Sequence, residues 1–296
     1  MTASVIIPHH NNQATLPRTL ESVRAAADGL DVEIVLVDDD EGHGASWARN
    51  RGLERARGDV IFFVDADDTV ERGFLSRPLA EMERTGADMC IFEFSGCSLK
   101  RDYNLSGNTS IRAALLPAFL GYSFDDVRRW NAGGALGLHR ELGSVWRVAF
   151  RRDFIERHAI RFDESLHIYE DATFLCDCAI FAESVVSLRE PLYNYIHNPA
   201  GNIATETGSP RHWQYKFDVL KARERMEKAG EGGVWKYCEA SCVLSALEIM
   251  RRWRGRGIMK YLSSERVRSA VRNFPISFRH PIAAAGVIFL RILSWF

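Results

Sequence analysis

Three carboxylates stand close together in the segment GDVIFFVDADDTVE. They follow Val60–Val64, an unbroken apolar run that is typical of a strand buried on both faces of a parallel sheet. Asp65, Asp67 and Asp68 are therefore expected at the C-terminal end of a buried strand, where open α/β sheets bind ligands. Clustered carboxylates there suit a divalent cation, Mn²⁺ or Mg²⁺, shared with substrate phosphates. The alternative is a polar turn in which Asp68 or Thr69 caps the next helix.

A second group of acids follows another predicted strand. Val32–Val37 is apolar apart from Glu33, and Asp38 and Asp39 follow it. With the strand predicted at Ala3–Ile7, which we expect Pro8 to end, and the helical pattern between them, it forms a βαβ unit. Two neighbouring parallel strands that both end in acids are expected to form a crevice for a nucleotide and a metal ion. The alternative is a charged surface turn.

A third acidic pair begins a predicted amphipathic helix. Glu170 and Asp171 precede an apolar pattern that runs through Phe181. Adjacent residues on a helix point about 100° apart, so only one of the two is expected to face the crevice. Two nearby carboxylates raise the pKa of one of them, which favours a general base near neutral pH. The alternative is a helix start at which acids are favoured by the helix dipole.

Length and cysteine content limit the class of protein. The 296 residues allow one large α/β domain with an appendage, or two small domains, and a composition of 46% hydrophobic and 26% charged residues is ordinary for a globular protein. The chain opens on a strand pattern and not on a signal peptide, and its six cysteines show no paired CxxC spacing. We therefore expect reduced thiols in a cytoplasmic protein.

Charge is distributed unevenly along the chain. Residues 251–296 contain ten Lys or Arg and one acid, which leaves 28 basic and 38 acidic residues in 1–250. Such asymmetry predicts an anionic surface as the partner of the C-terminal segment. The segment Ile282–Phe296 is apolar except for Arg291 and Ser294. Its 15 residues are fewer than the roughly 20 of a membrane span, so we expect an anchor at a membrane surface. The alternative is a helix that closes the protein's own core or a dimer interface.

The remaining pattern completes an alternating α/β arrangement. Residues 96–150 show little periodicity apart from one predicted helix, and only helix patterns are seen from Ser209 onward. The other expected helices are Ala45–Ala56, Phe74–Thr85, Ser110–Leu120 and Arg151–His158, and the other expected strands are Asp88–Phe94, Val185–Leu188 and Leu192–Ile196.

Taken in chain order, six segments resemble the landmarks of family 2 glycosyltransferases with the GT-A fold, in particular bacterial members that build capsule, exopolysaccharide or lipopolysaccharide. The segments are SVIIPHHNNQATLPRTLESV, EIVLVDD, ASWARNRGLERARGDVIFFVDADD, VWRVAFRRDFIERHAIRF, YEDATF and PLYNYIHNPAGNIAT. The likeness covers about residues 1–205. It implies a GT-A domain over 1–205, with a mostly parallel sheet flanked by helices, and leaves 206–296 as a basic helical extension.

The resemblance assigns roles to particular residues. It implies a nucleotide-diphosphate sugar as donor, a glycan or lipid-linked acceptor, Mn²⁺ or Mg²⁺ as cofactor, and no nucleic acid as partner. By position it places the catalytic base at Asp171, beside Glu170, and the metal at Asp67 with Asp65. The residues that the resemblance implies for donor binding are Pro8, His10, Asp38, Asp39, Arg49, Asp65 and His197.

The chain departs from the family pattern in three places. Asp39 and Arg49 are only ten residues apart, so a strand and helix usual in the family are missing between them. His197 replaces a more usual Arg, and Asn202 replaces a common Ser. Two other functions remain open: a nucleotidyltransferase with a similar sheet, and a membrane-associated scaffold that has lost its chemistry. The first class usually has a Gly-rich loop after the first strand, which PHHNN is not.

Overall fold

The structure is a computed structural model of the chain. It describes residues 1–99, 101–120, 142–166, 170–196 and 276–295, together with isolated positions and short runs between 129 and 274. The chain divides into two compact units. The first comprises Met1–Leu115 and Ser144–Ala200, and the second comprises Leu116–Gly143 and Gly201–Phe296.

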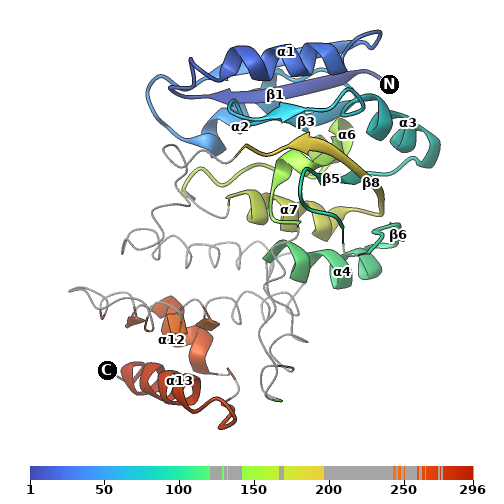
Figure 1. Cartoon of the computed structure of the whole chain (residues 1–296). Helices are drawn as coiled ribbons and strands as arrows, with labels where there is room; N and C mark the ends of the chain where they lie inside the picture. The colour runs from blue at the N-terminus through green and yellow to red at the C-terminus, as the bar shows by residue number, and fades with distance from the viewer. Residues whose placement is uncertain are drawn as a thin grey trace. The chain divides into compact units, whose positions relative to one another are not determined.

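The first unit is built on a mixed sheet (Figure 1). Among the described residues the sheet has eight strands in the order β2-β1-β3-β7-β5-β8-β4, with β6 paired to β8. The longer pairings are parallel: β1 with β2, β1 with β3, and β5 with β8. The strands are β1 Ala3–His9, β2 Val32–Asp38, β3 Val60–Phe63, β4 Thr69–Val70, β5 Met89–Phe94, β6 Leu105–Ser106, β7 Val148–Arg151 and β8 Ser184–Asn194.

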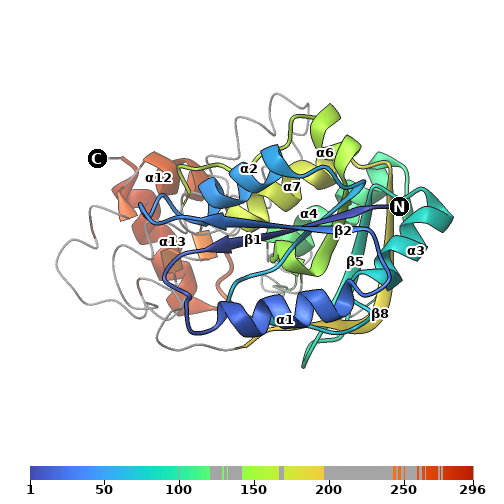
Figure 2. The same cartoon turned by 90° about the horizontal axis from the view of Figure 1, so that it is seen from above.

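Helices cover both faces of this sheet. Figures 1 and 2 show α1 and α2 on opposite sides of β1, as expected for parallel strands joined by helical crossovers. In the first unit the helices are α1 Leu16–Ala26, α2 Ala45–Arg55, α3 Ser76–Thr85, α6 Arg152–Arg157 and α7 Glu170–Phe181, with the 3₁₀ turn η2 at Val145–Arg147. Helix α4, Asn108–Leu120, begins in the first unit and ends in the second.

The apolar run of β3 is buried on both faces, as its sequence predicts. Phe62 packs into the cluster that includes residues of α1 and α3, and its ring centroid lies 5.2 Å from that of Phe74. The neighbouring Phe63 points to the other face, where its ring contacts Phe162 and Phe174. Successive side chains of a strand alternate between faces, so this short strand joins both cores and fixes the place where its carboxylates begin.

A glycine sets the close approach of α2 to the sheet. A Cβ atom built at Gly52 would lie 2.3 Å from Cγ2 of Ile6, a residue of β1. The absence of a side chain at this position therefore allows the helix backbone to pack directly on the strand. The same helix carries Arg49, so this packing determines how deeply the arginine is buried.

Two details of the sheet differ from the sequence prediction. The strands predicted separately at Val185–Leu188 and Leu192–Ile196 are one strand, β8, whose register against β5 shifts between Phe92 and Phe94. A register shift of this kind keeps the strand continuous across a local irregularity. The sequence pattern is interrupted at the same place, so it predicts two strands. In addition, β7 lies antiparallel between β3 and β5, in a region where the sequence shows little periodicity.

The second unit is described mainly at its C-terminal end. It contains α12, Glu265–Arg272, and α13, Pro281–Leu293. In the described part of the chain, no helix combines the length and the apolar character that a membrane crossing requires.

Candidate active site

The acidic turn after β3 is held in place by two hydroxyl groups, one from α1 and one from the residue that precedes this helix. Thr19 Oγ1 lies 3.0 Å from the Ala66 carbonyl oxygen and 2.7 Å from that of Asp68, and Thr15 Oγ1 donates to the Ala66 oxygen at 2.9 Å. Arg18 donates to the Asp67 carbonyl oxygen at 2.9 Å. Because these bonds go to the backbone, the carboxylates of the turn keep their oxygens for other partners.

Asp68 is the structural acid of the turn. Its buried carboxylate accepts a hydrogen bond of 2.7 Å from the Tyr193 hydroxyl and one of 2.6 Å from the Ile196 N–H. Burial raises the pKa of Asp68 to about 7, although these two donors oppose the change. Helix α3 begins only at Ser76, so the alternative in which Asp68 or Thr69 caps the next helix is wrong. The reason is that Thr69 instead enters β4 and pairs with β8.

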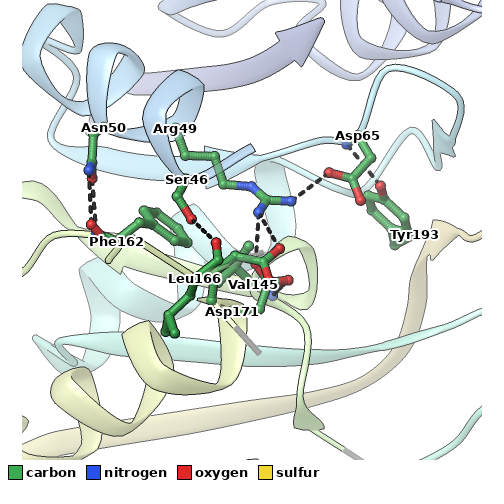
Figure 3. Close-up of polar contacts among 10 residues, drawn as sticks. Ser46, Arg49, Asn50, Asp65, Val145, Phe162, Leu166, Asp171 and Tyr193 are labelled. Atoms are coloured by element: carbon green, nitrogen blue, oxygen red, sulfur yellow. Dashed lines mark hydrogen bonds and ion pairs between the residues drawn. The ribbon is translucent and has the colours of Figure 1, made fainter. Parts of the chain in front are cut away.

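Tyr193 also fixes the first acid of the turn. Its hydroxyl oxygen accepts a hydrogen bond of 3.1 Å from the Asp65 N–H (Figure 3). Together with the bond to Asp68, this contact connects β8 to both ends of the turn through one phenol. The ring stacks on Trp146 at 4.3 Å between centroids. Burial is the main cause that raises the pKa of Tyr193, and the group stays a neutral hydrogen-bond donor.

Arg49 connects the acidic turn to the acidic pair on α7. Its guanidinium lies 3.0 Å from an Asp65 oxygen, 2.9 Å from Asp171 Oδ1 and 3.3 Å from a Glu170 oxygen, and Figure 3 shows it between Asp65 and Asp171. The arginine is buried. Burial works against its charged form, but Asp171, Asp65 and Glu170 outweigh burial and raise the pKa of Arg49. One cation therefore holds three carboxylates that are up to 122 residues away from it in the sequence.

Helix α2 also positions the segment that leads into α7. Asn50 exchanges two hydrogen bonds with the Phe162 backbone, at 3.0 and 2.9 Å, and Ser46 contacts the Leu166 oxygen at 3.5 Å (Figure 3). Arg49 lies between these two residues on the same helix. The bonds to the backbone thus keep the start of α7 within reach of the guanidinium.

Asp171 has the environment of a carboxyl that can exchange a proton near neutral pH. Burial raises its pKa to about 7, with Arg49 opposing the rise and Glu170 and Asp65 adding to it. Its second oxygen accepts a hydrogen bond of 3.1 Å from the Val145 N–H, the first residue of η2. The pKa of Glu170 is also raised, mainly by burial. Helix dipole alone does not account for this pair, because both acids face a buried cation.

The acids after β2 have separate environments. Asp39 is buried and accepts hydrogen bonds from the backbone N–H groups of His43 and Gly44, at 2.8 and 2.7 Å. Burial works to raise the pKa of Asp39, but these N–H groups and His43 hold it below its ordinary value. Asp38 is more than half exposed, and His9 Nδ1 lies 3.3 Å from it. Asp39 thus orders the loop, whereas Asp38 keeps its carboxylate open to a ligand.

The other expected donor residues lie beside these acids or outside the described residues. β1 continues through Pro8 to His9, so Pro8 does not end the strand as predicted. The ring of the exposed His10 contacts the Asp39 carbonyl oxygen at 2.6 Å between Nδ1 and O. His197 lies outside the described residues.

Comparison with known proteins finds similarity to one family of enzymes. The sequence profile described as Glycosyl transferase family 2 matches residues 4–41 and 40–135. The uncharacterized glycosyltransferase EpsJ of Bacillus subtilis (strain 168) is 28% identical over 225 residues, which cover 66% of this chain and 61% of EpsJ. The succinoglycan biosynthesis protein ExoO of Rhizobium meliloti (strain 1021) is 27% identical over 197 residues, 57% of this chain and 53% of ExoO.

The first half of the chain is thus similar to family 2 glycosyltransferases. The crystal structure of S. aureus TarS 1–349 in complex with UDP-GlcNAc matches it with a TM-score of 0.61 at 15% identity, covering 100% of this chain and 91% of that chain. The expected GT-A fold is thereby confirmed. The chain spans about half to three fifths of the length of the two curated relatives above.

The acidic turn fits a divalent cation through its donor chemistry. Burial, followed by the charge of Asp65, raises the pKa of Asp67, and the positive charge of Arg18 does not fully offset this rise. Within the described ranges, no three His, Cys, Asp or Glu side chains are grouped so that they could hold a metal ion. Mg²⁺-like cations are commonly held by one or two carboxylates plus substrate phosphates, which is the set that Asp65 and Asp67 offer to a nucleotide diphosphate.

Three positioning residues were not predicted from the sequence. Thr19 and Val145 show no chemical motif, and Tyr193 stands in the segment PLYNYIHN without a sign of what it contacts. The spacing of Thr15 and Thr19 is the one available signal, because residues four apart lie on the same face of a helix. Two threonines with this spacing, close to the end of a strand, are compatible with hydrogen bonds that hold the acidic turn.

Proposed function

We propose that this protein is a glycosyltransferase, which transfers a sugar from a nucleotide-diphosphate donor to a hydroxyl group of a glycan or lipid-linked acceptor in cell-surface polysaccharide synthesis. The Arg49 network supports the proposal most strongly, because it holds a carboxylate of the acidic turn and the acidic pair of α7 on one guanidinium. Sugar transfer needs a site for the donor diphosphate and a base for the acceptor hydroxyl close to each other, as the acids around Arg49 are. The name of ExoO, a succinoglycan biosynthesis protein, agrees with this class of product.

In the proposed reaction Asp171 is the general base. It accepts the proton of the acceptor hydroxyl while the hydroxyl oxygen forms a bond to the anomeric carbon of the donor. The bond between that carbon and the diphosphate oxygen breaks, and its electron pair leaves with the nucleoside diphosphate. A single displacement of this kind inverts the anomeric configuration. Arg49 and the Val145 N–H hold the two oxygens of Asp171, so they orient the base.

The donor occupies the two acidic strand ends in this proposal. Asp38, with Pro8 and His10 beside it, lines the nucleotide pocket, while Asp39 keeps the adjoining loop in place. Asp65 and Asp67 hold Mn²⁺ or Mg²⁺, which when bound supplies positive charge for the leaving diphosphate. The protein works in the cytoplasm, peripheral on the inner face of the cell membrane, where a lipid-linked acceptor is accessible. No nucleic acid takes part.

A panel of nucleotide sugars tests this function. The full chain is incubated with UDP- and GDP-sugars, starting with UDP-GlcNAc, with and without Mn²⁺, and thermal midpoints and released nucleoside diphosphate are measured. We expect at least one donor to raise the midpoint in the presence of Mn²⁺ and to be hydrolysed or transferred. Pyrophosphate exchange without sugar release would instead indicate a nucleotidyltransferase. Neither binding nor turnover across the panel would indicate an inactive scaffold and refute the proposal.

A further inference from the structure

Helix α13 has apolar side chains on two opposite faces. Ala284, Val287 and Leu290 are buried, and a Cβ atom built at Gly286 would lie 2.6 Å from Cδ2 of Leu247. The inward face is therefore already packed against its own unit, and the glycine allows close contact. A surface helix usually has a polar outer face, so the composition of the other side decides whether α13 needs a partner.

The outward face of α13 is an exposed apolar stripe. We define the stripe as Ile282, Ala285, Ile288, Phe289 and Ile292, all of them exposed. Their spacing of three or four residues places them on one side of the helix. Ile282 is 87% exposed and Ile292 is 53% exposed. Single exposed apolar residues are common, but a continuous stripe marks a contact surface.

Aromatic side chains lie at both ends of this stripe. Phe278, just before the helix, is 78% exposed, and Trp295, just after it, is 88% exposed. Trp is enriched where one part of a side chain is in an apolar medium and another part is in water. A surface with aromatic residues at its two ends and aliphatic residues between them is typical of a helix that lies in the plane of a membrane surface.

The charge around the stripe favours an anionic partner. Residues 266–296 contain five arginines and no acid. Arg272 and Arg279 are exposed, whereas Arg291 donates to the carbonyl oxygens of Val271 and Phe274 and so fixes α13 against the end of α12. A second copy of the chain would carry the same basic segment without an acid to pair with it, and like charges at an interface oppose association.

We propose that the outward face of α13 binds the surface of an anionic lipid bilayer, with the helix lying in the plane of the surface. The 13-residue helix is too short to cross a bilayer, which needs about 20 residues. In this orientation the stripe enters the boundary between headgroups and acyl chains, and the arginines remain at the level of the anionic headgroups. The inference does not depend on sugar transfer, because binding to vesicles needs neither donor nor acceptor.

Vesicle binding by the full chain tests the inference. We expect co-sedimentation with phosphatidylcholine vesicles containing 30% phosphatidylglycerol, and at least tenfold weaker partition into pure phosphatidylcholine. The double variant Ile282→Ser, Phe289→Ser should lose at least tenfold in partition. Leu36→Ser, at an exposed leucine of β2 in the other unit, is the matched control and should bind as the wild type does. Tryptophan emission should shift to the blue on binding, and Trp295→Phe should remove most of the shift.

Three results would overturn the inference. Equal partition into anionic and neutral vesicles would exclude the role of the arginines. Unchanged binding by the double variant would exclude the stripe. A dimer in size-exclusion chromatography that the double variant dissociates, without vesicle binding by the wild type, would identify the stripe as a contact between two copies. Because the substituted side chains are exposed, we expect all variants to keep the wild-type thermal midpoint, which is measured first.

Discussion

Replacement of Arg49 tests how the proposed base, Asp171, is kept in its ionised state. In the structure Arg49 is the cation that opposes the rise in the pKa of Asp171, which burial and two neighbouring carboxylates bring to about 7. Arg49→Gln removes that opposition and leaves Asp65, Glu170 and Asp171 without their shared partner. Arg49→Lys keeps a positive charge, but an ammonium group lacks the planar guanidinium that contacts Asp65 and the acids of α7 at the same time.

The expected magnitude follows from the acid limb of the pH profile. Each unit by which the pKa of Asp171 rises leaves roughly tenfold less ionised base at a pH below that pKa. We expect Arg49→Gln to move the acid limb of kcat/KM upward by at least about one unit, so that turnover at pH 7, close to the wild-type pKa, falls roughly fivefold or more. The deficit should narrow by pH 9. Arg49→Lys should keep the acid limb of kcat/KM near its wild-type pH, with a smaller loss of turnover than Arg49→Gln shows.

The assay is the pH dependence of sugar transfer or donor hydrolysis from pH 5.5 to 9.5, with donor affinity measured in parallel. Arg51→Gln is the matched control, because Arg51 lies on the same helix and pairs only with Glu54 among the ion pairs of the described residues. Removing one partner of a buried ion pair costs about 3–5 kcal/mol of stability, so folding of Arg49→Gln is first checked by its thermal midpoint. An unmoved acid limb would refute the reasoning. An unmoved limb with lost donor affinity would place Arg49 directly in the donor site.

Three further predictions concern the acidic turn and the base. Asp67→Ala should lose Mn²⁺-dependent donor binding in calorimetry without a lower thermal midpoint, because the folded state already disfavours the ionised Asp67; a retained Mn²⁺ response would contradict the metal assignment. Tyr193→Phe leaves the Asp68 carboxylate and the Asp65 N–H each without one partner. The unfolding free energy measured in urea should therefore fall by about 1–3 kcal/mol, and an unchanged unfolding curve would contradict these two hydrogen bonds. The native state binds an extra proton at Asp171 between the ordinary pKa and about 7, so the unfolding free energy of the wild type should fall from pH 5 to pH 8. Asp171→Asn should show a shallower fall in urea titrations at these pH values, and an equal slope would show that Asp171 is not the group that titrates.

The sequence was most informative where periodicity and chemistry coincide. The buried run Val60–Val64 predicts a strand that ends in acids, and β3 confirms the strand, whereas ligand binding at its end stays a prediction. The sequence does not distinguish Asp68 from Asp65 and Asp67, because the difference comes from Tyr193, 125 residues later. A tertiary contact decides which of three identical carboxylates is structural.

Other features could not be predicted for the same physical reason. β7 has only four residues and pairs with strands on both sides, so its placement depends on neighbours and not on its own pattern. The resemblance implied that Arg49 belongs to the donor site, whereas its contact with Asp171 across 122 residues appears only when α2 and α7 pack together. Because Arg49 is buried between them, one cation then affects both Asp65 and Asp171.

Turnover and donor affinity of Asp171→Asn, compared with Glu170→Gln, test the central claim most directly. Both variants are measured with the nucleotide sugar that the wild type accepts, by calorimetry for donor binding and by release of nucleoside diphosphate for turnover. Asp171→Asn should keep the wild-type donor affinity while kcat falls by roughly 10²–10⁴-fold, the contribution of a positioned base, and Glu170→Gln should lose less. Normal turnover by Asp171→Asn beside an inactive Glu170→Gln would show that the base is Glu170, and loss of donor binding by Asp171→Asn would show that Asp171 belongs to the donor site.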